Sequence, residues 1–214
     1  MEGGIPEIVI DDGPCSGKTT GISYFVGKLR DIGYRVFVVP EVATMLINPG
    51  LLDISSIAAK EPELYYAVER EMFRIQRALR KRFISLAREF PKEKTVILYD
   101  RGTMSVGAYL TEEKFARLIN EEKTPVAHLR DIYDGVILLV TAADGAERFY
   151  TTANNIARRE SAEEARSADQ RTQKVWSGRD HVYVIDNSTD FEDKLKRAYR
   201  AITRILGVPT PIQI

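Results

Sequence analysis

The glycine-rich run at residues 13–20, with the letters GPCSGKTT, constrains this sequence more than any other segment. It follows a short apolar run at residues 7–10 and precedes a segment with helical character at about 18–32. A turn of this kind between a strand and a helix aims consecutive backbone N–H groups at one point, which makes a fixed anion site. The pattern therefore predicts a loop that binds the phosphates of a nucleoside triphosphate.

The positions of this loop have separate expected roles. We expect Gly13 and Gly17 to permit the backbone path, Lys18 to reach the β- and γ-phosphates, and the Thr19 hydroxyl to hold Mg2+. The usual pattern has a glycine five residues before Gly17, and this sequence has Asp12 there. Asp12 either contacts the metal or fits the strand-end geometry, and both interpretations stay open. The predicted nucleotide-binding residues are Gly13, Pro14, Cys15, Ser16, Gly17, Lys18, Thr19 and Thr20, with Asn187 after the last strand.

Strands and helices alternate along the rest of the sequence, without an internal repeat. Further apolar runs, expected to be strands, occupy residues 34–39, 95–99, 135–140 and 181–185. Helical patterns occupy about residues 62–89 and 191–206. This alternation predicts an α/β fold with a five-stranded parallel sheet covered by helices on both faces. We expect one domain over residues 1–214, with a helical lid insert at about 144–178.

Polar residues follow the predicted strands, at the sheet edge where ligands of such folds bind. We expect Asp100 to hold Mg2+ or to orient an acceptor, and Arg101 to contact a phosphate. The alternative is that this Asp–Arg pair caps the following helix. Glu41 either accepts a proton from an acceptor hydroxyl or hydrogen-bonds that acceptor; the alternative is a solvated acid at a helix start. The other polar residues at strand ends are Asp12, Thr141 and Asp186.

The predicted lid is polar and rich in arginine. It contains Arg158, Arg159, Arg166 and Arg171, whose spacing lets several of them share a face of a short helical hairpin. Arginines on a flap can close over transferring phosphates and exclude water, whereas the mixed charge of the segment also fits a solvated surface helix. The predicted catalytic residues are Lys18, Glu41, Asp100, Arg101, Arg158, Arg159 and Arg166, with Thr19 and Asp100 at the metal.

Composition argues against several classes of function. The 31 Lys and Arg residues balance the 31 Asp and Glu residues, which disfavours nonspecific binding to nucleic acid or membranes. No run of about 18 apolar residues is present, and the N-terminus does not resemble a signal peptide. Cys15 is the only cysteine, so we expect a reducing, cytoplasmic setting. A basic stripe on the long helix is either a solvated face or a polyanion site; it consists of Arg70, Arg74, Arg77 and Lys81.

Five stretches together resemble a P-loop kinase-like domain. They are GPCSGKTTG, VPEVAT, YDRG, TAADGAERFYTT and DNSTDFE, and they spread over nearly the whole chain. They are similar to the ATPase-like domain of the TRPL translocation defect family and to nicotinamide riboside kinase, and more distantly to thymidylate and deoxynucleoside kinases. The resemblance implies the strand order 2-3-1-4-5.

The same resemblance implies roles for the site residues. In nucleoside kinases an acidic residue after the second strand acts as the base, and this position falls on Glu41. The Asp-Arg pair at the third strand falls on Asp100 and Arg101. The lid arginines fall loosely on Arg158, Arg159 and Arg166.

The expected activity is phosphoryl transfer from ATP or GTP, with Mg2+, to a small nucleoside- or nucleotide-like acceptor. In animal members of the TRPL translocation defect family, a triphosphate-tunnel-like domain follows this one and the protein is linked to GTP binding. The sequence ends at Ile214, so we expect this domain alone and carry over no lipid-binding role. The alternatives are a nucleotide-dependent switch with a protein partner and a polynucleotide 5′-kinase, although a Ras-like Asn-Lys-x-Asp motif is missing. The donor base, the acceptor and the oligomeric state stay open.

Overall fold

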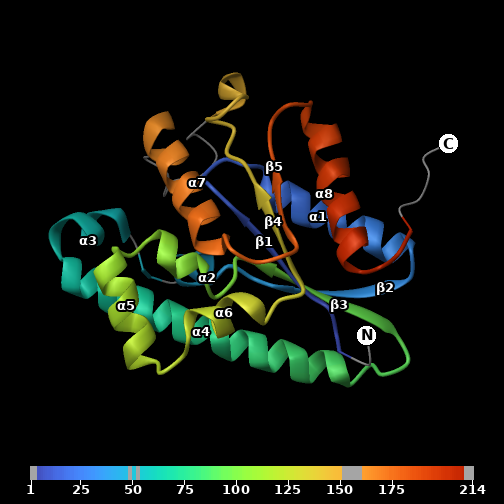
Figure 1. The fold of residues 1–214 in the computed structure, drawn as a ribbon, viewed down its shortest axis with the longest axis horizontal. Helices are drawn as coiled ribbons and strands as arrows, with labels where there is room; N and C mark the ends of the chain where they lie inside the picture. The colour runs from blue at the N-terminus through green and yellow to red at the C-terminus, as the bar shows by residue number, and fades with distance from the viewer. Residues whose placement is uncertain (1–3, 48–49, 52–53, 151–160, 210–214) are drawn as a thin grey trace.

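The computed structural model describes residues 4–47, 50–51, 54–150 and 161–209. At its centre five parallel strands form a sheet in the order β2-β3-β1-β4-β5 (Figure 1). The predicted α/β class and the predicted strand order are both confirmed. The strands are β1 (Glu7–Asp12), β2 (Tyr34–Val39), β3 (Lys94–Asp100), β4 (Gly135–Leu139) and β5 (Val182–Ile185).

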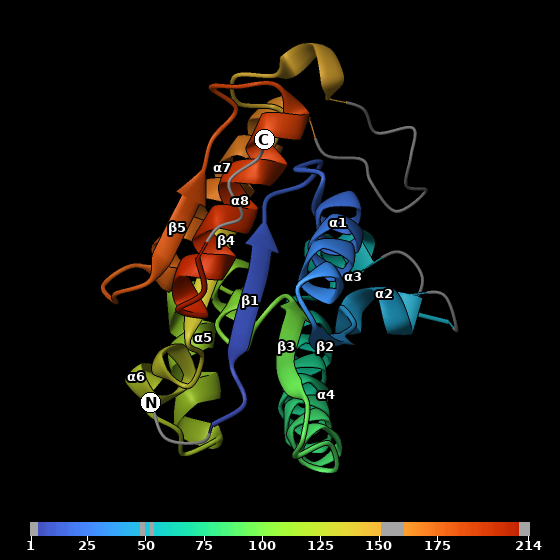
Figure 2. The ribbon, with the colours of Figure 1, turned by 90° about the vertical axis from the view of Figure 1, so that its right-hand side faces the viewer.

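The register of the strands brings their carboxyl ends to one edge. Ile10 of β1 pairs with Asp100 of β3, and Asp12 of β1 pairs with Leu139 of β4. In Figure 2 the arrows of β1 and β5 run upward, toward the loop that precedes the first helix. Because parallel strands all end at this edge, the polar residues that follow them become neighbours.

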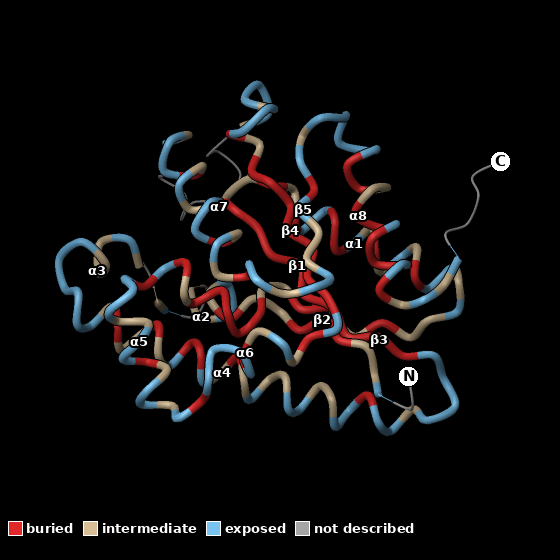
Figure 3. Tube along the Cα trace, in the orientation of Figure 1, coloured by how far each residue is buried: buried red, intermediate tan, exposed pale blue. Residues whose placement is uncertain are grey.

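Two hydrophobic cores lie on opposite faces of the sheet, because alternate residues of each strand point to opposite faces. Ile8 and Ile10 of β1 pack with helices α1 (Lys18–Asp31) and α8 (Phe191–Ile205). Val9, between them, packs in the second core, under α4 (Pro62–Arg88) and the elements that follow it. The buried positions accordingly concentrate along the strands in Figure 3.

The second core is covered by more elements than the first. Besides α4 it includes residues of η1 (Ser105–Ala108), α5 (Glu112–Glu121), α6 (Val126–Asp131) and α7 (Ala162–Trp176). The remaining elements are α2 (Val42–Ile47), α3 (Ile54–Lys60) and η2 (Glu147–Phe149). No helix among the described residues is long and apolar enough to cross a membrane.

Candidate functional site

The glycine-rich loop between β1 and α1 turns through two residues with positive φ. Cys15 has a φ of 62° and Gly17 one of 88°, in the left-handed region that glycine adopts without steric cost. Gly17 also lies close to Phe191, since a Cβ atom at position 17 would be 2.4 Å from the Phe191 ring. Any other residue at position 17 would therefore be strained both by its backbone and by this ring.

Donors from other elements hold three successive carbonyl oxygens of the loop. They are the Thr141 hydroxyl on the Pro14 oxygen, the Ala142 N–H on the Cys15 oxygen at 3.1 Å, and Lys194 Nζ on the Ser16 oxygen at 3.3 Å. In a trans peptide group the C=O and the following N–H point in opposite directions. The N–H groups of residues 15–17 therefore point away from these donors, as is required of a loop that binds phosphate with its amides.

Lys18 begins α1, and its side chain is buried among carboxylates. Its Nζ atom donates to Oδ1 of Asp100 and lies 3.7 Å from Oδ1 of Asp12. Burial alone would lower the pKa of Lys18, but attraction by Asp12 and by the other carboxylates of the site outweighs it and raises that pKa. Lys18 is therefore a full cation at neutral pH.

Arg101, the residue after β3, joins the ends of three strands. Its Nε atom donates to Oε1 of Glu41 at 2.5 Å, and its Nη1 atom donates to Oδ1 of Asp11 at 3.0 Å. Its Nη2 atom lies 3.1 Å from Oδ1 of Asp12. Arg101 thus connects the Glu41 carboxylate, which follows β2, with the Asp11 and Asp12 carboxylates at the end of β1. This role differs from the helix cap that we left open.

Glu41 and Asp100 have opposite pKa shifts. Burial alone would raise the pKa of Glu41, but Arg101 and Lys18 outweigh it and lower that pKa to about 2. Burial is the largest cause for Asp100 as well, and there it prevails over Lys18, so the pKa of Asp100 is raised. The Thr44 hydroxyl holds the second oxygen of Glu41 at 2.6 Å. Glu41 is therefore a fixed, ionised acceptor, whereas burial opposes the ionised form of Asp100.

Asp11 is a central residue of this network that sequence reasoning missed. Its side chain is fully buried. One oxygen accepts hydrogen bonds from Ser105 at 2.5 Å and from Trp176 Nε1 at 2.7 Å, and the other accepts from Arg101 and from the Asp12 N–H. The sequence did contain a signal for it. Asp11 lies within the strand and not after it, and a carboxylate that is buried in a strand needs hydrogen-bond or ionic partners.

Asp169, on α7, was also missed, and it holds the start of the phosphate loop. Its Oδ1 atom accepts hydrogen bonds from the N–H groups of Gly13 at 3.0 Å and of Thr141 at 3.2 Å. Gln173 donates to its other oxygen at 2.7 Å. No sequence signal pointed to this contact, because Asp169 and Gly13 are 156 positions apart.

Lys194, on α8, is the third missed residue, with a side chain only 2% exposed. It donates to the Val140 oxygen at 2.6 Å and to Asn187 Oδ1 at 2.7 Å, in addition to Ser16. Burial lowers the pKa of Lys194 to about 8. A signal did exist here, since Lys194 interrupts the apolar face of the helix next to Leu195 and Ala198.

Asn187, predicted to contact the nucleotide, is engaged within the protein. Its Nδ2 atom donates to the carbonyl oxygens of Thr141 at 2.8 Å and Asp144 at 2.6 Å, and its Oδ1 atom accepts from Lys194. Its side-chain amide therefore ties the loops after β4 and β5 together. Asp190 is the N-cap of α8, where its side chain accepts from the Asp193 N–H at 2.8 Å.

The predicted lid divides into two parts. Residues 162–176 form α7, whose Trp176 is fully buried in the second core, so this part is a packed helix and not a flap. Arg166 and Arg171 on this helix donate to the carbonyl oxygens of Ala143 and Ala108, both at 2.8 Å. Arg158 and Arg159 lie outside the described residues. The predicted lid can therefore include residues 144–161 but not α7.

The basic stripe on α4 faces α5 and is paired with its acidic end. Arg74 and Arg77 contact the Glu122 carboxylate at 2.8 and 3.2 Å, and Arg70 contacts Glu121 at 3.4 Å. These pairs neutralise much of the stripe, which removes the observation that favoured a polyanion site.

The charges at the strand ends fit a divalent cation. Four carboxylates, of Asp11, Asp12, Glu41 and Asp100, are paired with two cations, Lys18 and Arg101. Within the described residues, Asp12 Oδ1 is buried and accepts no hydrogen bond, so it has room for a further cation. The same residues contain no group of three or more His, Cys, Asp or Glu that could hold a metal ion by itself. Mg2+ commonly takes one or two protein ligands and completes its shell with phosphates and water. Asp100 and the exposed Thr19 hydroxyl would hold it here.

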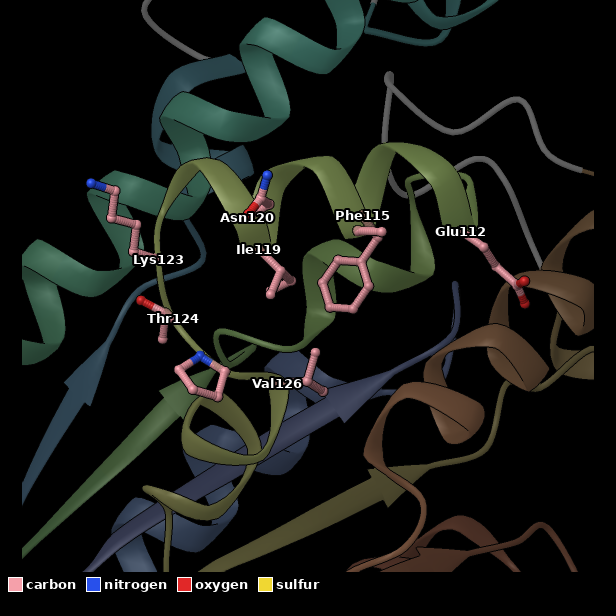
Figure 4. A pocket seen from close by; sticks show the side chains of 9 residues that line it. Glu112, Phe115, Ile119, Asn120, Lys123, Thr124 and Val126 are labelled. Atoms are coloured by element: carbon pink, nitrogen blue, oxygen red, sulfur yellow. The ribbon is translucent and has the colours of Figure 1, made fainter.

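A separate hollow of about 630 Å3 lies at the junction of α5 and α6 (Figure 4). Apolar side chains such as Phe115, Ile119 and Val126 line most of it. None of its lining residues comes from the phosphate loop or from a strand end, so it is not part of the site described above.

Two of three comparisons with known proteins gave matches. A protein-family model described as an AAA domain matches residues 7–194. Among 239 matching chains of solved structures is a deoxyadenosine kinase from M. mycoides with bound dCTP. It is 14% identical, with a TM-score of 0.60, and the match covers 92% of this chain and 99% of that chain. At this identity the likeness shows the fold. A search of curated proteins found no match.

Proposed function

The chain belongs to an AAA domain family of P-loop NTPases, and we propose that it transfers the γ-phosphoryl group of ATP or GTP to a small nucleoside- or nucleotide-like acceptor. The observation that carries this proposal is the contact between Glu41 and Arg101 at 2.5 Å, in the same charge network as Lys18 and Asp100. A nucleotide-binding loop alone has no need of an oriented carboxylate at this place.

On the donor side, the loop amides of residues 15–17 and Lys18 bind the phosphates. The transition state of phosphoryl transfer is loose, with negative charge spread over the equatorial oxygens, so fixed cations stabilise it more than covalent chemistry does. Lys18 supplies one such charge. When bound with the nucleotide, Mg2+ neutralises further phosphate charge, and Thr19 and Asp100 would hold it.

On the acceptor side, Glu41 accepts a hydrogen bond from the acceptor hydroxyl and aims it at the γ-phosphate. With a pKa of about 2, Glu41 is ionised at every physiological pH but is a weak base. Its main contribution is therefore to orient the acceptor hydroxyl. Orientation contributes most of the rate enhancement when the transition state is loose. Arg101 holds Glu41 in this position. Arg158 and Arg159 are proposed to approach the phosphates from the lid.

Two finer assignments also belong to this proposal. The stretches VPEVAT and YDRG support a relation to the TRPL translocation defect and nicotinamide riboside kinase-like proteins. The single cysteine, Cys15, supports a reducing, cytoplasmic setting.

The direct test is a screen for transfer from radiolabelled ATP and GTP, with Mg2+, to nucleosides, nucleotides and 5′-hydroxyl oligonucleotides. We expect a phosphorylated nucleoside-like product, and slow hydrolysis without an acceptor. A screen without any product would contradict the proposal. A protein partner that binds only the triphosphate-loaded form would then favour the alternative, a nucleotide-dependent switch.

A further inference from the structure

Lys194 is a buried cation whose charge the proposed mechanism does not use. It lies on α8 and is only 2% exposed. Its ammonium group donates to the Val140 oxygen at 2.6 Å, to Asn187 Oδ1 at 2.7 Å and to the Ser16 oxygen at 3.3 Å. An ammonium group has three hydrogens to donate, so each of them has an acceptor. All three acceptors are uncharged.

The positive charge of Lys194 has no negative charge in contact with it. Its polar contacts within the described part of the chain are with uncharged atoms alone. Burial lowers the pKa of Lys194 to about 8, against the opposite effects of Asp169 and Asp12, so the group is still mostly protonated at neutral pH. Lys18 and Arg101 differ from it, because both contact carboxylates directly.

A neutral donor holds another carbonyl of the same loop. The Thr141 hydroxyl donates to the Pro14 oxygen, and this contact involves no charge. Burying an ammonium group without a paired carboxylate lowers the stability of the fold, whereas a hydrogen-bonded neutral donor costs much less. The need to hold the Ser16 oxygen therefore does not explain why its donor is charged.

The Ser16 oxygen connects Lys194 to the phosphate side of the loop. It belongs to the same peptide group as the Gly17 N–H, which points in the opposite direction. A cation on the carbonyl oxygen polarises this peptide group, so the Gly17 N–H becomes a stronger donor toward an anion. The charge also attracts that anion directly, and salt screens this attraction little because the ammonium group is buried.

We infer that Lys194 is a positioning residue of the phosphate site, and that the phosphates of a bound nucleotide supply the counter-charge that its buried ammonium group lacks. This inference rests on the donor side of the proposed function, since it assigns a second cation, besides Lys18, to the same phosphates. Lys194 acts from the opposite side of the loop, through the peptide group of Ser16 and Gly17 and through its charge. Its contribution to affinity therefore increases with the negative charge of the bound phosphates.

Binding of phosphates without a nucleoside tests this inference. Inorganic tripolyphosphate, ATP and ADP are titrated calorimetrically, with Mg2+, into the wild type and Lys194→Met. Because a charge-assisted contribution is lost, we expect tripolyphosphate and ATP to bind about tenfold more weakly to Lys194→Met, and ADP about threefold more weakly. Tripolyphosphate is the decisive ligand, because it has no base that Asn187 could affect.

Three further variants separate the charge from the structure of the loop. Lys194→Gln offers an amide donor without a charge; we expect it to lose affinity as Lys194→Met does, and it decides the question if Lys194→Met does not fold. Thr141→Val removes the neutral donor from the Pro14 oxygen and weakens all three ligands by the same factor. Lys196→Met removes a positive charge from the same helix, one that is paired with Glu192, and leaves all affinities unchanged.

The outcomes for the inference and for the proposed function are distinct. Equal tripolyphosphate affinities in the wild type and the Lys194 variants overturn the inference, and so does a wild type that binds no tripolyphosphate. A loss that is equal for ADP and ATP, or that appears with ATP but not with tripolyphosphate, overturns it as well. A protein that loses phosphate affinity as expected in Lys194→Met, but whose wild type phosphorylates no acceptor, contradicts only the proposed function.

Discussion

Lys18 Nζ is hydrogen-bonded to Oδ1 of Asp100, so the lysine of the phosphate loop and the acid at the end of β3 neutralise each other. A triphosphate that recruits Lys18 has to compete with this carboxylate. Asp100, half-buried and with a raised pKa, then needs another cation. A divalent metal that arrives with the triphosphate supplies one. Triphosphate and metal binding are therefore expected to be coupled through this pair.

The variant Asp100→Asn should uncouple triphosphate binding from metal binding. We expect its affinity for ATP or GTP to fall at least tenfold when Mg2+ is present, because one metal ligand is weakened. In EDTA the affinity should be unchanged or higher, because Lys18 is released from the carboxylate. Calorimetric titrations with Mg2+ and with EDTA give both values. An equal fall under both conditions would show that Asp100 acts on the fold and not on the metal.

Lys18→Ala should weaken triphosphate binding about 10- to 100-fold, since hydrogen bonds to charged groups are among the strong ones. Because Lys18 is buried, this variant also removes the cation that is paired with Asp100, so its thermal stability should be recorded beside its affinity. Arg30→Ala, at an exposed position of the same helix, is the control. A folded Lys18→Ala protein with wild-type affinity would exclude the predicted role of the loop.

Glu41→Gln should separate binding from transfer. The amide keeps the size of the side chain but removes the negative charge of the carboxylate, to which Arg101 and Thr44 donate hydrogen bonds. We expect kcat to fall about a hundredfold while the affinity for Mg2+ and triphosphate stays close to that of the wild type. Single-turnover transfer to the acceptor found in the screen measures the first quantity. Weaker triphosphate binding in this variant, with an unchanged rate of transfer at saturating triphosphate, would exchange the roles of Glu41 and Asp100.

The fold and the positions of the charged residues Lys18, Glu41 and Asp100 were predictable, because each is indicated by a short, continuous stretch of sequence. The apolar runs that became β3 and β4 are buried on both faces, as their composition indicated. The strand–loop–helix pattern located Lys18, and the strand ends located Glu41 and Asp100. A parallel sheet brings such positions together whatever their spacing in the sequence.

The missed residues act through partners that are distant in the sequence. Asp11 bonds to Trp176 and Asp169 bonds to Gly13, and these separations of 165 and 156 positions leave no periodic signal. The charge density of the predicted lid was misleading for α7. That helix keeps its arginines on backbone carbonyls while its apolar side packs in the core.

Asp169→Ala should lower both stability and nucleotide affinity. It leaves the buried N–H groups of Gly13 and Thr141 without their acceptor, at a cost of about 2–4 kcal/mol in the free energy of unfolding. Asp169→Asn keeps an acceptor oxygen and should be milder. The exposed neighbour Gln170 gives the matched control, Gln170→Ala. Urea denaturation and triphosphate titration measure the two effects, and full stability in Asp169→Ala would show that this contact does not hold the loop.

Lys194 should make stability depend on pH in an unusual direction. Burial lowers its pKa from 10.5 to about 8 in the folded protein, so between these two values the unfolded chain binds the additional proton. The contribution of Lys194 to the free energy of unfolding therefore rises with pH over this interval, by up to about 3 kcal/mol. Below pH 8 both states are protonated, and the cost of burying the charge is present in full.

The comparison with Lys194→Met isolates this effect, because methionine fills similar space without a titrating group. Urea denaturation at pH 7, 8, 9 and 10 should show the wild type gaining stability relative to Lys194→Met as the pH rises above 8. Lys196→Met, two residues along the same helix and paired with Glu192 at 2.8 Å, should show no such gain. A constant difference between wild type and Lys194→Met across this range would mean that Lys194 keeps its ordinary pKa. Its bonds to Ser16 and Val140 would then persist at high pH.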